Sequence, residues 1–219
     1  MKKILLTVVA IAGLFTAQAQ IKEGTVTYSV AVDGAPAEQA AMMKGMELTI
    51  AFKDTKSRVD FSMSMMTSTT VSDDNGSLTL TDGMGMKTFT KLSKADVDKE
   101  SKKNPDPKIT YTEEKKTIAG YECKKAIVEV KDQKGETQKV NVWYTDKLPN
   151  NSGGRMASFK GLKGAPLEFE MNQGPMKMKM TATKVSLAAI PDSQFKLSTD
   201  GYTEMKMEDL QKMRQGGGK

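Results

Sequence analysis

Apolar and polar residues alternate one by one along much of this chain. Residues 24–32 alternate valines and a tyrosine with polar neighbours, which is the period of two typical of a half-buried β-strand. The alternation returns over residues 46–52 and 59–65, on either side of the polar stretch 53–57. These two runs predict an antiparallel hairpin with one apolar face and one polar face.

The alternation continues over residues 67–92 with two interruptions. Residues 73–76 (Asp-Asp-Asn-Gly) and 82–85 (Asp-Gly-Met-Gly) are rich in the residue types that occupy tight turns. Strands joined in this way, one after another, predict an antiparallel meander.

Helical signals are few and weak. Ser93 and Asp96 have the spacing of a capping box, but the residues up to 103 are almost all polar, so we expect a short, exposed helix there. Residues 35–45 favour a short helix or a flap, and residues 203–213 a weak helix. The chain is therefore predicted to be mainly β.

A central hairpin is predicted around the only cysteine and the only tryptophan. Residues 117–130 contain Cys123, and residues 140–145 contain Trp143, with a polar segment between the two runs. The apolar face of the first run changes near residues 124–125. This change predicts a β-bulge or a strand that is buried on both sides.

A further hairpin is predicted to fold on a four-residue loop at residues 172–175. The loop pairs Met171 with Met176, Phe169 with Met178, Leu167 with Met180, Glu170 with Lys177, and Glu168 with Lys179. Opposite charges across neighbouring strands add about 0.2–1 kcal/mol per pair. The pattern also opposes a slip of one residue, which would turn the charged face inward.

The first 19 residues have the form of a signal peptide. Two lysines precede an apolar run that ends in Ala17-Gln18-Ala19, and that run is too short to span a bilayer. We therefore expect export to the periplasm, a single β-rich domain over residues 20–214 and a disordered tail over residues 215–219. No other segment is apolar enough to predict a membrane span.

Composition excludes several kinds of chemistry. The chain has no histidine and one cysteine, so triads that need a histidine base, and the usual zinc ligands, are missing. Its 33 basic and 27 acidic residues are interspersed without interleaved aromatics, which argues against nucleic-acid binding. Cys123 is expected to be a small buried side chain. No catalytic residue, metal site or cofactor is predicted.

Methionine is the unusual residue, with 17 in the chain. Pairs with Met-x-Met spacing occur at residues 63–65, 84–86, 176–180 and 205–207. Thioethers are soft ligands suited to Cu(I). They also fill irregular interiors, or line surfaces that adapt to variable ligands. Packing or adaptable lining is the favoured interpretation, with Cu(I) binding as an alternative.

Several motifs in the C-terminal half resemble a known family. The segment 116–126 (Lys-Thr-Ile-Ala-Gly-Tyr-Glu-Cys-Lys-Lys-Ala), Val142-Trp-Tyr-Thr145, Pro191-Asp-Ser-Gln-Phe195 and Gly201-Tyr202 resemble the secreted domain-of-unknown-function family 4412. Some of these motifs are also similar to the GLPGLI secreted family, but Gly161-Leu-Lys-Gly164 departs from that family's signature. The resemblance implies a fold similar to the periplasmic lipoprotein carrier and its outer-membrane receptor: a curved antiparallel sheet that forms an incomplete half-barrel around an apolar cavity.

The sequence thus predicts a non-enzymatic periplasmic protein that binds a lipid, an acyl chain or another apolar ligand. The predicted lining is rich in methionine and phenylalanine: Phe61, Met63, Leu167, Phe169, Met176, Met178 and Met180. Two alternatives are a structural or interaction module of the envelope, with a protein partner and no ligand, and a Cu(I)-binding protein.

Overall fold

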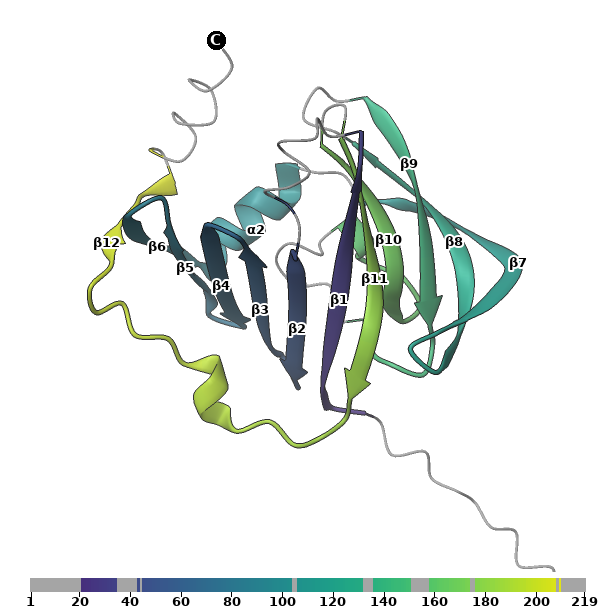
Figure 1. The fold of residues 1–219 in the computed structure, drawn as a ribbon, viewed down its shortest axis with the longest axis horizontal. Helices are drawn as coiled ribbons and strands as arrows, with labels where there is room; N and C mark the ends of the chain where they lie inside the picture. Colours follow the sequence, from purple (N-terminus) through teal and green to yellow (C-terminus); the bar gives the residue numbers. More distant parts are fainter. Residues whose placement is uncertain are drawn as a thin grey trace, which may run out of the picture.

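The computed structural model describes residues 21–34, 43, 45–103, 106–131, 136–150, 158–173, 176–207 and 209. Within them, twelve strands join one sheet in the order β12-β6-β5-β4-β3-β2-β1-β11-β10-β9-β8-β7 (Figure 1). The strands are β1 (Glu23–Asp33), β2 (Glu47–Lys53), β3 (Lys56–Met63), β4 (Met66–Asp73), β5 (Gly76–Gly83), β6 (Met86–Ser93), β7 (Lys108–Ile118), β8 (Tyr121–Lys131), β9 (Thr137–Thr145), β10 (Ala165–Gln173), β11 (Met176–Ser186) and β12 (Thr203–Glu204). All neighbours are antiparallel except β12 and β6.

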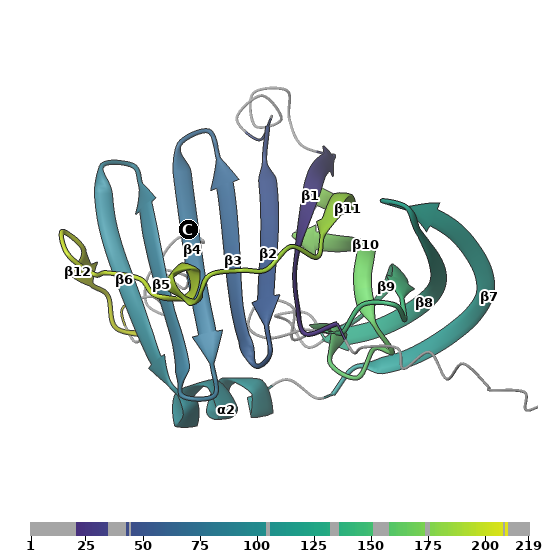
Figure 2. The ribbon, with the colours of Figure 1, turned by 90° about the horizontal axis from the view of Figure 1, so that it is seen from below.

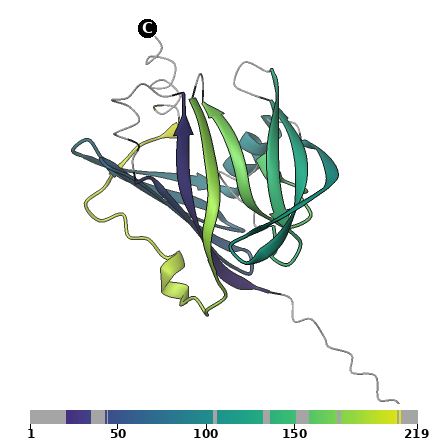
Figure 3. The same cartoon turned by 45° about the vertical axis from the view of Figure 1, so that its right-hand side comes forward.

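The sheet is open and strongly curved, as the sequence predicted. Strands β1–β6 form a broad, gently twisted half, whereas β7–β10 bend round beside β11 and β1 (Figure 2, Figure 3). The two ends of the sheet, β7 and β12, do not pair. The predicted class, a mainly β incomplete barrel, is confirmed.

The apolar core fills the curved half of the sheet. Its completely buried members include Cys123, Ala126, Val128, Leu167 and Phe169. The rings of Phe159 and Tyr28 approach Phe169 edge to face, with centroids 4.9 and 5.8 Å away. The concave side of this half is therefore packed with side chains from β1–β3 and β8–β11.

The central hairpin differs from its prediction. Ala119 and Gly120 adopt positive φ values of 48° and 82° and separate β7 from β8, so residues 117–130 are two strands. Such paired left-handed residues form the tight turn that joins neighbouring antiparallel strands. The predicted irregularity is present in the facing strand: the pairing of β7 with β8 shifts between Tyr111 and Lys115.

The hairpin of β10 and β11 forms, but its predicted pairing was wrong by two residues. Met171 lies opposite Met178, and Phe169 opposite Met180. The strands continue to Gln173, so the connection is shorter than the predicted four-residue loop. A shift of two residues keeps every side chain on its own face, and alternation alone does not detect it. The Lys179 Nζ still lies 3.2 Å from the Glu168 Oε1, now diagonally.

The predicted capping box is confirmed at the start of α2 (Lys94–Lys103). The Asp96 backbone N–H donates to the Ser93 Oγ at 3.2 Å, and the Ser93 N–H donates to the Asp96 Oδ2 at 3.1 Å. The Ser93 hydroxyl also donates to the Asp96 Oδ2 at 2.6 Å, and this hydrogen bond, together with that from the Ser93 N–H, lowers the pKa of Asp96. Residues 35–42, the first 20 residues, and residues 210–219 lie outside the described part, so the predicted flap, signal peptide and tail are not placed.

The predicted helix at residues 203–213 does not begin at Thr203. Thr203 and Glu204 instead form β12, which pairs with Thr88 and Phe89 of β6. The Met205 backbone N–H donates to the Phe89 carbonyl at 2.8 Å. Among the described residues, no helix has both the length and the apolar character needed to cross a bilayer.

Candidate ligand cavity beneath the C-terminal segment

The seven residues predicted to line an apolar cavity fall into three groups. Leu167 and Phe169 are completely buried and Met180 is nearly so; all three belong to the core. Phe61, Met63 and Met178 are half-buried. The Met176 side chain lies outside the described part. Met178 and Phe61 pack against the core, and none of the six residues whose side chains are described contributes to the two cavities below.

The face of the sheet that meets the core changes from apolar to hydroxyl-rich between β3 and β4. Ile50 pairs with Val59, and Val59 pairs with Thr70. Thr70 pairs in turn with Thr79, and their hydroxyls are 2.9 Å apart. Directly paired residues share a face, so this face is apolar as far as β3 and rich in hydroxyls beyond it.

The apolar residues of β4–β6 consequently lie on the opposite face. Arg58 pairs with Val71, Val71 with Leu78, and Leu78 with Lys91. This row faces away from the core because each member neighbours, in its strand, a residue of the core face. Val71 and Leu78 are nonetheless half-buried, so something other than the main core covers them in part.

The cover is the stretch 187–202, here called the C-terminal segment, which includes the 3-10 helix η2 (Asp192–Phe195). It leaves β11, crosses the strands of the broad half and reaches β12 beside β6 (Figure 1, Figure 2). The Arg58 Nη1 donates a hydrogen bond of 2.9 Å to the Gln194 carbonyl. This contact fixes η2 over the face that carries Val71 and Leu78.

Polar contacts hold the start of the C-terminal segment. The Lys53 Nζ lies 3.0 Å from the Asp192 Oδ1 and donates to the Ile190 carbonyl at 2.8 Å. The Ile190 N–H donates to the Glu23 Oε2 at 2.8 Å. The Lys56 Nζ is 3.6 Å from the same Asp192 oxygen. The hydrogen bond from Lys53 and the charges of Lys53 and Lys56 lower the pKa of Asp192.

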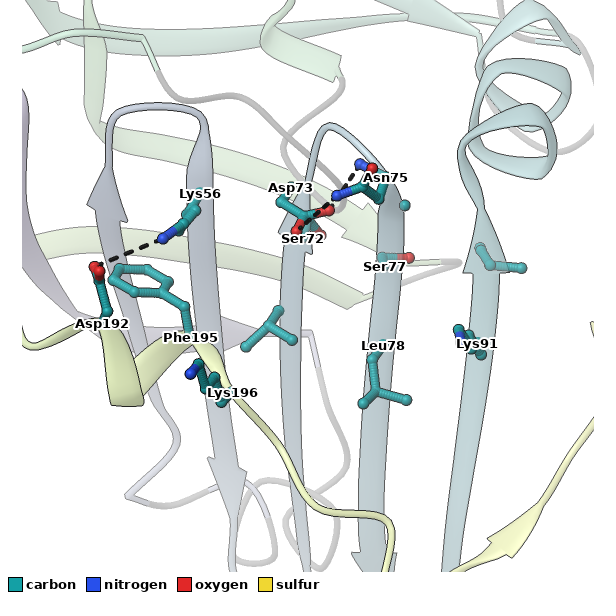
Figure 4. Close-up of a pocket in the computed structure, with 13 residues that line it drawn as sticks. Lys56, Ser72, Asp73, Asn75, Ser77, Leu78, Lys91, Asp192, Phe195 and Lys196 are labelled. Carbon is teal, nitrogen blue, oxygen red and sulfur yellow. Dashed lines mark hydrogen bonds and ion pairs between the residues drawn. The ribbon is translucent and has the colours of Figure 1, made fainter.

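A cavity of about 420 Å³ lies between η2 and the sheet (Figure 4). Its apolar lining comes from Val71, Leu78, Leu92 and Phe195. The polar lining comes from Lys56, Ser72, Asp73, Asn75, Gly76, Ser77, Lys91, Asp192 and Lys196. Ligand sites commonly have volumes of about 300–1,000 Å³ and combine apolar walls with a few polar groups. The cavity has both properties.

The charges around this cavity are unevenly neutralised. Asp192 is shared by Lys53 and Lys56, and Asp73 accepts a hydrogen bond of 2.7 Å from the Asn75 backbone N–H. Lys91 and Lys196 have no ion-pair partner within the described part of the chain. The lining thus carries three ammonium groups, of Lys56, Lys91 and Lys196, against the two carboxylates of Asp73 and Asp192, an excess of one positive charge.

A second cavity, of about 330 Å³, lies beside the irregularity of β7. Its lining is polar, with Glu113, Lys115 and Asp146 among its charged members. The Lys124 Nζ is 2.8 Å from the Asp146 Oδ2, and the Lys163 Nζ lies 4.8 Å from the Tyr111 ring centroid. An apolar ligand in this cavity would desolvate these charged groups.

The sequence reasoning missed the cavity beneath the C-terminal segment. Alternation over residues 77–81 places Leu78 and Leu80 on one face and three hydroxyl residues on the other, but it does not say which face meets the core. The motif 191–195 shows only a resemblance to a family in the sequence. Its partners, Lys53 and Arg58, are more than 130 residues away in the chain, and no local signal links them.

No protein-family model matches the chain, and no curated protein does, so membership in family 4412 stays a prediction. The chain is similar to two structures of PNGF-II, with a TM-score of 0.50 and identities of 16% and 17% over 88% of this chain. It covers only 33% and 32% of those chains, about one third of their length. At these identities the likeness shows a shared fold and no more.

Two smaller proteins are also similar. The lipoprotein LppX of Mycobacterium tuberculosis has a TM-score of 0.40 and 7% identity, over 77% of this chain and 89% of LppX. A LolA superfamily protein of Nitrosomonas europaea has a TM-score of 0.38 and 10% identity, over 81% of this chain and 91% of that one.

Proposed function

We propose that this protein is a non-enzymatic binding protein of the cell envelope that holds an apolar or amphiphilic ligand, such as a lipid or an acyl chain. The observation that carries the proposal is the cavity beneath the C-terminal segment. Its apolar wall is separate from the folded core, so a ligand would not have to displace core side chains.

The positions of the apolar residues support this site. Val71 and Leu78 of the sheet and Phe195 of η2 are all half-buried, outside the main core. Their place beneath a crossing segment gives an apolar chain a sheet on one side and η2 on the other. The lysines at the rim suit a ligand with an anionic end, since Lys91 and Lys196 have no carboxylate partner among the described residues.

The expected affinity is modest. Each buried methylene supplies about 0.8 kcal/mol, so eight methylenes supply roughly 6 kcal/mol before the costs of association. The net free energy is therefore less favourable than about −6 kcal/mol, which corresponds to dissociation constants above roughly 40 μM. Such binding allows both pick-up and release.

The periplasmic location and the absence of catalysis belong to the same proposal. They rest on the signal-peptide pattern of residues 1–19 and on a chain without histidine. The ligand has a second candidate location, which is the apolar lining predicted from the sequence at Phe61, Met63, Leu167, Phe169, Met176, Met178 and Met180. The half-buried Met178 is the residue through which that location can be tested.

A neutral fluorescent probe, N-phenyl-1-naphthylamine, tests the proposal by titration. Leu78→Thr is expected to weaken probe binding about tenfold, because it removes roughly 1.5 kcal/mol of apolar contact. Leu80→Thr is the matched control, since Leu80 lies on the same face of β5 but does not line the cavity.

Equal effects of Leu78→Thr and Leu80→Thr would contradict the site. If Met178→Thr weakens binding and Leu78→Thr does not, the ligand binds in the predicted methionine-rich lining instead. No enhancement of probe fluorescence with the unmodified protein would contradict ligand binding altogether.

A further inference from the structure

Methionines gather at one end of the broad half of the sheet. The turns that join β3 to β4 and β5 to β6 lie at the same end (Figure 2). Met65 and Met84 stand in these turns, and their exposed fractions are 63% and 83%. Met86, which begins β6, is 55% exposed. These three side chains are not packing a core.

Most of the large apolar side chains that are exposed contain sulfur. Among the described residues, the large hydrophobic side chains that are exposed are Met65, Met84, Met86, Met171, Tyr111 and Leu187. Four of the six are methionines. A surface that only needed to be apolar would use leucine or phenylalanine as readily, so the choice of thioethers calls for a chemical reason.

Pairing across the sheet brings two thioethers toward one another. Met66 of β4 lies opposite Gly83 of β5, and Gly83 lies opposite Met86 of β6. The three residues therefore share one face. Because Gly83 has no side chain, the space between Met66 and Met86 is open.

The side chain of Met66 borders this space closely. A Cβ placed on Gly83 would meet the Met66 Cγ at 2.9 Å and its Cβ at 3.0 Å. The Cβ and Cγ of Met66 therefore border the space over Gly83, on the face that Met86 shares. Strands two places apart are separated by about 9–10 Å, a distance that two methionine side chains and one ion between them can span.

From this arrangement we infer a site for a soft monovalent cation, Cu(I), bound between the thioethers of Met66 and Met86 over Gly83. Met63, which lies opposite Met66 on the same face, and the exposed Met84, in the turn between Gly83 and Met86, are the neighbouring thioethers available for a third ligand. Soft sulfur ligands select Cu(I) over the hard divalent cations. Thioethers also cannot form disulfides, so an oxidising compartment does not remove them as ligands in the way that it removes thiols.

This inference is independent of the proposed ligand cavity. The cavity is lined near the opposite ends of the same strands, at the turn that contains Asp73 and Asn75. It also differs from a site built on Met-x-Met spacing. Met63 and Met86 lie in strands, whereas their partners Met65 and Met84 lie in turns, so the members of each pair are not held on one face.

Ag(I), a redox-inert probe of Cu(I) sites, tests the inference by calorimetric titration of the full chain in a chloride-free buffer. All variants carry Cys123→Ala, which removes the thiol as a competing soft ligand, and circular dichroism checks their fold. We expect one Ag(I) per chain. Met66→Leu with Met86→Leu should weaken its binding at least tenfold, whereas the control Met171→Leu with Met178→Leu should not.

Methyl resonances of ¹³C-labelled methionine give the second readout. Addition of Ag(I) should shift the methyl signals of Met66 and Met86 and leave that of Met180 in place. The inference is overturned if the double leucine variant binds Ag(I) as tightly as the unmodified pair, if the shifted signals belong to other methionines, or if no ion binds at 100-fold excess.

Discussion

Truncation of Phe169 tests whether the curved half of the sheet encloses a packed core or forms the wall of a ligand cavity. Its side chain is completely buried, and two aromatic rings contact it edge to face. Truncating a buried phenylalanine to alanine costs about 3–5 kcal/mol, through lost burial and the cavity left behind. A large part of the stability of a typical domain, about 5–15 kcal/mol, would be lost.

Urea unfolding measures this loss, with the half-buried Trp143, the only tryptophan, as fluorescent reporter. With a slope of about 2.5–3 kcal/mol per molar urea, the upper end of the usual range and suited to a domain of this size, Phe169→Ala should lower the midpoint by roughly 1–2 M. Met171→Ala is the control on the same strand; Met171 is 39% exposed and should cost less than about 1 kcal/mol. A loss below about 1 kcal/mol for Phe169→Ala would mean that the ring borders an open recess, and the description of a packed core would be wrong.

Three further predictions follow from local contacts. Burial alone would raise the pKa of Glu168, but the hydrogen bonds and charges of Lys116 and Lys179 have the larger effect and lower this pKa. The ionised carboxylate therefore stabilises the fold at any pH above its pKa in the unfolded chain. This stability is lost as the pH falls through the pKa of Glu168 in the folded protein. Glu168→Gln should lower the free energy of unfolding by about 1–3 kcal/mol at pH 7. In urea melts between pH 5 and 2, the variant's stability should also depend less on pH than that of the unmodified protein. An unchanged pH dependence would refute the pairing of Glu168 with the two lysines. Asp192→Asn should release the C-terminal segment and speed its cleavage in limited proteolysis, whereas an unaltered cleavage rate would show that the lysine contacts do not hold it. Burial raises the pKa of the Cys123 thiol to about 11, so alkylation at pH 8 should be slow in folded protein and fast in urea; rapid labelling of the folded chain would contradict its burial.

Local pattern was enough to predict most of the strands. The runs at residues 46–52 and 59–65 became β2 and β3, and the turns at 73–76 and 82–85 lie where the glycines and aspartates placed them. Each of these elements depends on neighbours close in the chain, for which alternation and turn chemistry carry the information.

What failed depends on information that alternation does not carry. The pairing of Met171 with Met178 differs from the predicted pairing by two residues, and the faces are the same in both. Leu78 alternates with hydroxyl residues equally well whichever face meets the core. The C-terminal segment is placed by Lys53 and Arg58, through contacts across most of the chain length. The cavity is therefore a product of tertiary structure.

The central claim, that an apolar chain binds beneath the C-terminal segment, is tested most directly by photolabelling. A fatty acid with a diazirine near the end of its chain would be bound, irradiated and located by peptide mass mapping. The account predicts labels within residues 71–78 and 187–196, on the two sides of the cavity. Labels confined to residues 167–180, or no label that excess unmodified fatty acid suppresses, would contradict it.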